Sequence, residues 1–157
     1  MGVEIERKFV VTSDAWRRAP GVRVVQAYLA REAACSVRVR IVEDTAWLSV
    51  KGRARDGAKP EFEYVIPVPE AKELIELSPY PVIEKVRRKI EYEGFVWEVD
   101  EFFGANAGLV VAEIELDAPD QPFPLPPWIG QDVTDDPRYI NANLVVHPYG
   151  EWKAHNQ

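Results

Sequence analysis

The chain has very few of the residues that most often carry nucleophilic or zinc-based chemistry. It contains one cysteine, Cys35, and two histidines, His147 and His155, among 157 residues. A single cysteine excludes an internal disulfide, and no cluster of Cys and His offers the ligands of a zinc site. We interpret Cys35 as an ordinary thiol and the two histidines as surface residues.

Long apolar runs and an excess of positive charge are also missing. No stretch of 18 apolar residues occurs, and the opening MGVEIERKF carries charges where a signal peptide needs an apolar run. The formal net charge of −7 disfavours broad binding to nucleic acid or to an anionic membrane, because either needs a basic surface. We expect a cytoplasmic monomer or homodimer with no nucleic-acid or membrane partner.

The composition is that of a folded globular protein. Apolar residues make up 46% of the chain and charged residues 29%, which argues against general disorder. A chain of 157 residues is long enough for one domain with a real hydrophobic core. We expect a single domain over residues 1–157, with residues from about 148 to 157 forming a loose tail.

Short β-type segments dominate the chain. Polar turns separate several of them, among them Glu43-Asp44 and Glu93-Gly94, and residues 53–60 (RARDGAKP) are typical of a flexible loop. The eight predicted strands are Val3–Val11, Arg23–Arg31, Ser36–Val42, Trp47–Gly52, Glu61–Val68, Val82–Tyr92, Phe95–Phe103 and Leu109–Asp117.

Helical signals are few. Apolar residues at helical spacing, with Pro69 at the start, predict a helix over Pro69–Leu77, and shorter helix starts are predicted at Ser13–Trp16 and Thr134–Tyr139. The segment Asp117–Trp128 contains five prolines and is predicted to be extended. Eight successive strands with few helices favour a mainly β (α+β) fold, as an antiparallel barrel or sandwich.

The strands share an unusual distribution of charge. In the opening E-I-E-R-K, the residues Glu4, Glu6 and Lys8 recur at period two and therefore lie on one face of a strand. Doublets of one sign recur in the same way on the other strands, whereas a solvated face usually mixes polar residue types. Same-sign neighbours repel, so a fold that keeps many of them needs compensating charges nearby.

Two interpretations of these doublets compete. In one, the apolar faces form the core and the doublets line an ordinary solvated surface. In the other, the eight strands close into a barrel with the charges inward, and the helices and the proline-rich segment cover its outside. The second interpretation gives six inward carboxylates and six inward cations: Glu4, Glu6, Glu61, Glu63, Glu113 and Glu115, and Lys8, Arg38, Arg40, Lys51, Lys85 and Arg87.

Such a lining favours a polyanion together with divalent cations. Carboxylate oxygens suit Mg²⁺, whereas arginine grips phosphate oxygens in a bidentate manner and lysine adds compact charge. Phosphoryl transfer needs no Cys or His nucleophile, because positioning, charge neutralisation and a metal-activated water carry it.

The ordered motifs resemble those of CYTH domains, also called triphosphate tunnel metalloenzymes. The resemblance begins with ExExK at Glu4–Lys8 and extends over nearly the whole chain, to V-T-D-D-P-R-Y at Val133–Tyr139. Between them, in family order, are Q-A-Y-L (Gln26–Leu29), V-R-V-R (Val37–Arg40), L-S-V-K-G (Leu48–Gly52), E-F-E-Y (Glu61–Tyr64), K-V-R (Lys85–Arg87), W-E-V-D (Trp97–Asp100) and A-E-I-E-L (Ala112–Leu116).

The resemblance implies a closed eight-stranded antiparallel barrel with a few short covering helices. The tunnel of this barrel is expected to bind a triphosphate and two divalent ions, either Mg²⁺ or Mn²⁺. The resemblance places the six carboxylates on the metal side and the six cations around the phosphates. It implies that Glu4, Glu6 and Lys8 are catalytic residues. To these it adds Asp100, which either holds a basic residue in place or contacts metal-bound water. It also adds Tyr28, at the tunnel mouth, as a residue that influences substrate choice. Lys89 and Glu98 share the inward parity, and a structural ion pair explains them equally well.

The resemblance therefore predicts a metal-dependent hydrolase that cleaves inorganic triphosphate to pyrophosphate and phosphate. Within the family, the same tunnel could instead act on nucleoside triphosphates or thiamine triphosphate, or cyclise ATP. A third alternative is a polyphosphate- or nucleotide-binding module without catalysis, although a pure anion binder has little use for six glutamates.

Overall fold

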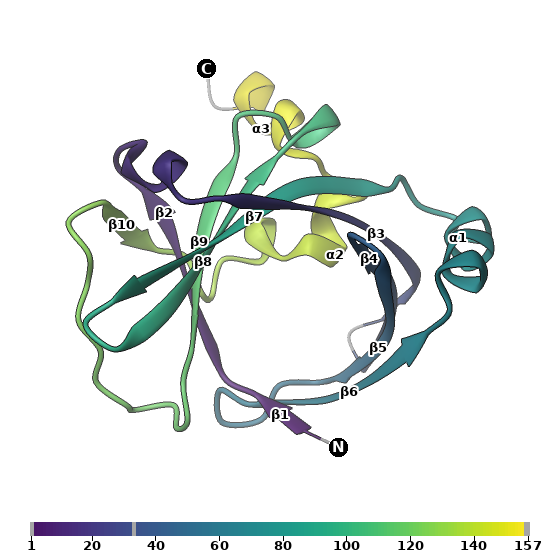
Figure 1. Ribbon diagram of the computed structural model, residues 1–157, viewed down its shortest axis with the longest axis horizontal. Helices are drawn as coiled ribbons and strands as arrows, with labels where there is room; N and C mark the ends of the chain where they lie inside the picture. Colours follow the sequence, from purple (N-terminus) through teal and green to yellow (C-terminus); the bar gives the residue numbers. More distant parts are fainter. Residues whose placement is uncertain (1, 33, 156–157) are drawn as a thin grey trace.

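Ten antiparallel strands form a single sheet that curves into a ring in the computed structural model, which describes residues 2–32 and 34–155 (Figure 1). The strands are β1 (Gly2–Glu4), β2 (Glu6–Val11), β3 (Gly21–Arg31), β4 (Cys35–Val42), β5 (Thr45–Gly52), β6 (Lys59–Ile66), β7 (Ile83–Tyr92), β8 (Phe95–Phe102), β9 (Val110–Glu115) and β10 (Ile129–Asp132).

The strand order confirms a mainly antiparallel β fold but not the predicted closed barrel. The hydrogen-bonded order is β1-β6-β5-β4-β3-β7-β8-β9-β2-β10, so β1 and β10 are edge strands and the order does not return to its start. The prediction of a closed eight-stranded barrel is therefore wrong in both strand number and closure.

Two local features account for the difference. The predicted strand Val3–Val11 is divided at Ile5, because β1 pairs with β6 whereas β2 pairs with β9. The tenth strand, β10, pairs with β2. Its sequence, Ile-Gly-Gln-Asp, follows a proline-rich stretch and lacks alternating apolar residues, so period-two patterning could not reveal it.

Tight turns join the neighbouring strands where the sequence predicts them. Glu93 and Gly94 both have positive φ, 48° and 85°, which is the conformation of a two-residue hairpin turn between β7 and β8. The polar segment 53–60 is also ordered around a turn, since Arg55 and Ala58 form an isolated antiparallel bridge.

The helical elements are short, as predicted. Helix α1 (Val68–Glu76) matches the predicted helix within one residue at each end. The predicted starts at Ser13 and Thr134 each lead into one 3-10 turn, η1 (Ala15–Arg18) and η3 (Pro137–Tyr139). The remaining elements are η2 (Gly104–Asn106), α2 (Asn141–Leu144) and α3 (Tyr149–His155). In the described ranges, no helix is long and apolar enough to cross a membrane.

Most of the hydrophobic core lies outside the ring of strands. Helix α1 lies outside the ring (Figure 1). It buries Ala71 against Val39 and Ala46, which face outward from β4 and β5. On another side, Trp16 of η1 and Trp128 of the proline-rich segment pack with the outward faces of β2, β8 and β9. The residues buried in that second cluster are Phe9, Trp16, Trp97, Val99, Ala112, Ile114, Leu116 and Trp128.

The C-terminal helices close one end of the ring. Leu144 of α2 and Trp152 of α3 are buried against Ile83, Phe102 and Val111, which face inward from β7, β8 and β9. The ring centroid of Trp152 lies 5.0 Å from that of Tyr149 and 5.0 Å from that of Tyr139. A loose tail was predicted from about residue 148, but residues 149–155 form α3; residues 156 and 157 of that prediction lie outside the described ranges.

Replacing Trp152 with alanine tests whether α3 is an integral part of the fold. Since the side chain is 5% exposed and packs against two other rings, Trp152→Ala should lower the free energy of unfolding by about 3 kcal/mol. Leu125→Ala, at a residue that is 55% exposed, is the control and should change it by less than about 0.5 kcal/mol. Chemical denaturation of both variants measures the difference, and equal midpoints would contradict the docking of α3.

Candidate active site

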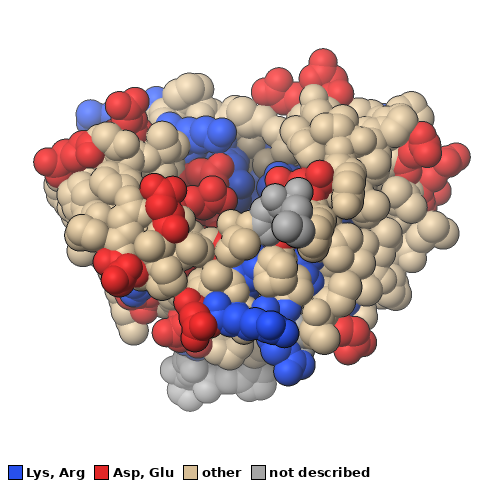
Figure 2. Space-filling model, turned by 90° about the horizontal axis from the view of Figure 1, so that it is seen from below, with Lys and Arg blue, Asp and Glu red and all other residues tan. Residues whose placement is uncertain are grey.

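The inward faces of the strands surround a cavity of about 1140 Å³. Figure 2 shows a hollow on one face of the molecule in which basic and acidic side chains meet. Ten Lys or Arg residues and nine Asp or Glu residues line the cavity. The two signs nearly balance, so the cavity is neither a simple anion site nor a simple cation site.

Period-two reasoning placed the charged residues on the correct face. Thirteen of the fourteen predicted site residues line the cavity, and Asp100 is the exception. The thirteen are Glu4, Glu6, Lys8, Tyr28, Arg38, Arg40, Lys51, Glu61, Glu63, Lys85, Arg87, Glu113 and Glu115. Lys89 and Glu98 line it as well.

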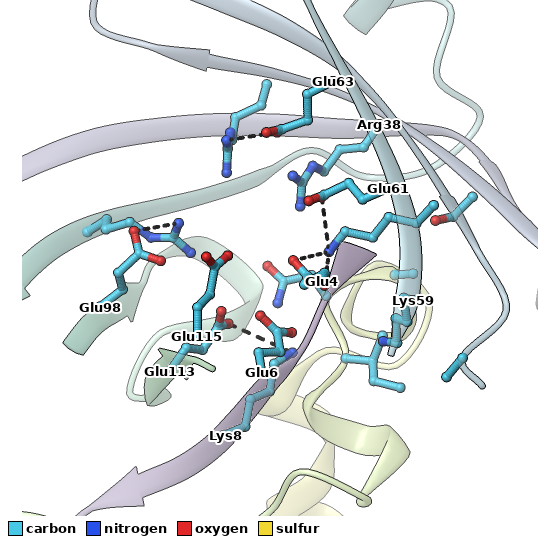
Figure 3. Close-up of a pocket in the computed structure, with 18 of the residues that line it drawn as sticks. Glu4, Glu6, Lys8, Arg38, Lys59, Glu61, Glu63, Glu98, Glu113 and Glu115 are labelled. Atoms are coloured by element: carbon cyan, nitrogen blue, oxygen red, sulfur yellow. Dashed lines mark hydrogen bonds and ion pairs between the residues drawn. The ribbon is translucent and has the colours of Figure 1, made fainter. Parts of the chain in front are cut away.

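Strand register brings carboxylates directly opposite one another on one side of the cavity. Glu6 of β2 lies opposite Glu115 of β9, and Glu98 of β8 lies opposite Glu113 of β9. Figure 3 shows these four side chains from three strands converging on the same space. Like charges in directly opposite positions destabilise a sheet unless something compensates them.

Two of these carboxyl groups lack a compensating cation. Neither Glu6 nor Glu115 forms a hydrogen bond or ion pair with any residue in the described part of the chain. Burial, and then the charge of Glu113, raises the pKa of Glu6 to about 8, although Lys8 opposes the shift. Burial, and then the charge of Glu4, raises the pKa of Glu115. This side of the cavity therefore favours an added positive charge, which either a proton on Glu6 or a bound cation can supply.

The opposite wall carries guanidinium groups with unused donors. The Nε atoms of Arg38 and Arg40 are buried and have no hydrogen-bond partner among the residues that the structure describes. Burial lowers the pKa of Arg40, and the nearby positive charges of Arg38 and Arg87 lower it further. Buried donors without a partner are costly, so these two arginines are poised for an acceptor that enters the cavity.

Other charges of the cavity pair with one another. Lys51 Nζ lies 2.8 Å from Glu4 Oε1 and 3.6 Å from Glu61 Oε2. Arg40 Nη2 lies 3.4 Å from Glu63 Oε2. These pairs connect strands β1, β4, β5 and β6, and they reduce the repulsion within each same-sign doublet.

Asp100 lies behind the cavity wall and holds two of its cations. The carboxylate is 1% exposed and accepts hydrogen bonds from Lys85 Nζ at 2.8 Å and from Arg87 Nε and Nη2 at 2.7 and 2.8 Å. Burial acts to raise the pKa of Asp100, but the charges of Lys85 and Arg87 outweigh it and hold that pKa well below its usual range. Of the two roles that the resemblance implied, this contact is that of a residue holding basic groups in place.

Tyr28 lies at the covered end of the cavity rather than at an open mouth. It is 5% exposed and belongs to the cluster that also contains Ile83, Leu144 and Trp152. A tunnel-mouth position was predicted, but the C-terminal helices cover this end.

Sequence reasoning missed several lining residues that carry polar groups, among them Arg31, Lys59 and Asn141. A bulge in β3 between Tyr28 and Ala30 shifts the alternation, so Arg31 faces the cavity although strict period two points it outward. Asn141 comes from the four-residue helix α2, for which the sequence gives no signal. Lys59 begins β6 opposite Glu4, in a segment that was interpreted as a loop.

The chemistry of the carboxylate set fits a hard divalent cation. Six glutamates offer oxygen donors, and a divalent cation could take the place of the proton that the raised pKa values of Glu6 and Glu115 favour. Within residues 2–32 and 34–155, no three His, Cys, Asp or Glu side chains are gathered closely enough to hold a metal ion. The donors are thus of the right kind but are not drawn together around one point.

Comparison with known proteins identifies the family. The model of the CYTH domain matches residues 2–149. An inorganic triphosphatase of Acetivibrio thermocellus is 52% identical over 155 residues, which cover 98% of this chain and 99% of that protein. An inorganic triphosphatase of Nitrosomonas europaea is 30% identical over 147 residues, which cover 91% and 97%.

The fold is also similar to that of a solved member. A crystal structure of an inorganic triphosphatase superposes with a TM-score of 0.68 at 30% identity, covering 93% of this chain and 96% of that one. The match of the family model over nearly the whole chain agrees with the motifs and with the charged cavity. The chain therefore belongs to the CYTH domain family.

Proposed function

We propose that this protein hydrolyses inorganic triphosphate to pyrophosphate and phosphate. The observation that carries the proposal is one cavity in which uncompensated carboxylates face buried guanidinium donors without partners. The name of the relative that is 52% identical, inorganic triphosphatase, supports this choice of substrate.

The cationic side chains bind the phosphate groups in this proposal. Arg38 and Arg40 supply the unused donors. Arg87 also lines the cavity, and its hydrogen bond to the Asp100 carboxylate fixes its orientation. A guanidinium fixed before the substrate arrives loses little entropy when it binds phosphate oxygens, and it stabilises charge that develops during transfer. The full binding set is Lys8, Arg38, Arg40, Lys51, Lys85 and Arg87.

The carboxylates would hold divalent cations, which we propose to be two Mg²⁺ or Mn²⁺ ions. Bound there, the ions would supply charge neutralisation and Lewis acidity at the phosphate groups. Glu6 and Glu115 are the strongest candidates, because they lie opposite each other without a counter-charge. The full carboxylate set is Glu4, Glu6, Glu61, Glu63, Glu113 and Glu115.

The remaining assignments stay predictions. Tyr28 lines the covered end of the cavity, where we propose that it influences substrate choice. A cytoplasmic location, the oligomeric state and the absence of macromolecular partners also stay predictions. Nucleoside triphosphates, thiamine triphosphate and ATP cyclisation stay alternatives that the assays below separate from hydrolysis of inorganic triphosphate.

Phosphate release by the purified protein is the first test. We expect metal-dependent release from inorganic triphosphate, with slower release from ATP, thiamine triphosphate and pyrophosphate. A chelator should abolish it, because the carboxylate side would lose the cations that neutralise the substrate. Absence of release from all four compounds, with no cyclic product formed from ATP, would favour a binding module instead.

Removing one uncompensated carboxylate tests the metal side. Glu6→Gln and Glu115→Gln should each lower turnover by about a hundredfold while triphosphate binding stays measurable, since the change removes a charge but keeps the volume. Both variants should also lose most of the rise in melting temperature that Mn²⁺ gives the unchanged protein.

The matched control is Glu73→Gln on the exposed face of α1, which should behave like the unchanged protein. Full activity of both cavity variants would show that the carboxylate assignment is wrong. Melting curves without metal separate a loss of activity from a loss of fold.

Removing a cation tests the phosphate side. Arg40→Ala should raise KM for triphosphate about tenfold or more, because a charge-assisted hydrogen bond with a buried donor is lost. Arg23→Ala, which removes a mostly exposed arginine on β3, is the control. Steady-state kinetics decide the matter, and an unchanged KM for Arg40→Ala would refute its role in binding.

A further inference from the structure

Asn141 is a buried polar residue at the covered end of the cavity, and the roles assigned above do not use it. It lies at the start of α2, is 8% exposed and lines the cavity together with its neighbours in that helix. Its side chain meets Gln26 of β3 and Lys85 of β7, each of which is no more than 2% exposed.

The partners of Asn141 fix the orientation of its amide. Its Oδ1 accepts hydrogen bonds from Lys85 Nζ at 3.0 Å and from Gln26 Nε2 at 2.9 Å. An ammonium group can only donate, so the atom of Asn141 that faces Lys85 must be the oxygen. The amide nitrogen therefore occupies the opposite branch of the side chain.

That nitrogen is open to the cavity. Asn141 Nδ2 forms no hydrogen bond with an acceptor in the described ranges. Asn141 Nδ2 is also not fully buried, because it is not among the buried side-chain atoms that lack a partner in those ranges. Those atoms are Gln26 Oε1, Arg38 Nε, Arg40 Nε and Trp97 Nε1. Since Asn141 lines the cavity, its free N–H groups are available to whatever occupies that space.

Cations surround this end of the cavity. Lys85 is bonded to Asn141 itself, and Lys8 Nζ donates to the carbonyl of Tyr139 at 3.3 Å, two residues before Asn141. Arg31 also lines the cavity here, on the chain beyond the bulge in β3. Lys85 pairs with Asp100 at 2.8 Å and Lys8 lies 3.9 Å from Glu113, whereas Arg31 has no carboxylate partner in the described ranges. Arg31 therefore leaves positive charge at this end of the cavity, which suits an anion.

Arg31 holds the helix that carries the amide. Its Nε donates to the carbonyl of Ala142 at 2.8 Å, and its Nη2 donates to Asn143 Oδ1 at 2.9 Å. Asn143 Nδ2 in turn donates to the carbonyl of Pro137 at 2.8 Å. These bonds attach α2 to β3 and to η3, so the Asn141 amide is held in place before a ligand arrives.

We propose that Asn141 is a substrate-binding residue whose Nδ2 donates a hydrogen bond to a phosphoryl oxygen of the triphosphate. The inference rests on the proposed function, because it takes an oligophosphate as the occupant of the cavity. Asn141 contributes an uncharged, directional donor among cations, while its Oδ1 keeps Lys85 and Gln26 oriented. Loss of the amide therefore affects affinity for the phosphate chain.

Two substitutions separate this role from a purely supporting one. Asn141→Asp keeps an oxygen for Lys85 and Gln26 but replaces the donor with an anionic oxygen, whereas Asn141→Ala removes both functions. If Asn141 donates to phosphate, the aspartate variant must bind triphosphate more weakly than the alanine variant. If it only positions Lys85, Asn141→Asp must lose no more affinity than Ala142→Asp, which places a carboxylate at the neighbouring lining residue and measures charge repulsion alone.

Calorimetric titration with inorganic triphosphate, in the presence of a chelator, measures binding without turnover. We expect affinity to fall about tenfold for Asn141→Ala and about a hundredfold for Asn141→Asp, as for a lost hydrogen bond to a charged group and for added repulsion. Asn106→Ala is the matched control. Asn106 is also a buried asparagine, and it accepts from the backbone N–H of Tyr149 at 2.9 Å, outside the cavity lining. It should lose stability but keep its affinity.

The outcomes separate the inference from the proposed function. Binding by the unchanged protein without phosphate release would overturn the hydrolase proposal, while the order of the three affinities still decides the role of Asn141. An Asn141→Asp variant that loses no more affinity than Ala142→Asp, or an unchanged protein that does not bind triphosphate, would overturn the inference. Should Asn141→Asp fail to fold in melting experiments, an unaltered affinity of Asn141→Ala would overturn it as well.

Discussion

The charged interior of the ring is the constraint on which the rest of the structure depends. Ten cations and nine carboxylates face one cavity, so the apolar faces of the same strands must point outward, away from that cavity. An apolar outer surface has to be covered, and α1 and the proline-rich segment with η1 provide that cover. The C-terminal helices instead cover inward-facing apolar residues at one end of the ring. The buried carboxylate of Asp100 is an example of the same constraint, because the charges of Lys85 and Arg87 offset the free-energy cost of burying it.

The alternation of charges made much of this arrangement predictable. Because side chains alternate across a strand, Glu4 and Glu6, Arg38 and Arg40, and Glu113 and Glu115 had to share faces once their segments were strands. The same rule placed Lys51 and Glu61 within reach of each other on neighbouring strands. The apolar spacing after Pro69 predicted α1, since a helix that covers a sheet needs one apolar stripe.

What could not be predicted depends on contacts between distant segments. The division at Ile5 arises because β1 pairs with β6 whereas β2 pairs with β9, and no local sequence pattern shows which strands the first residues will pair with. The bulge that turns Arg31 inward adds one residue to the alternation of β3, and an apolar count cannot locate it. Asn141 gains its partners only because α2 lies across the end of the ring, so its surroundings are tertiary rather than local.

The division at Ile5 also creates a seam, meaning the point between β1 and β2 at which the sheet is not joined by strand pairing. Glu4 and Glu6 stand on either side of it, on strands that pair with opposite flanks of the sheet, β6 and β9. An occupant that contacts both carboxylates would connect the two strands across this seam, and its binding free energy would add to the free energy of unfolding. Such an occupant would therefore make the ring more rigid than it is with an empty cavity.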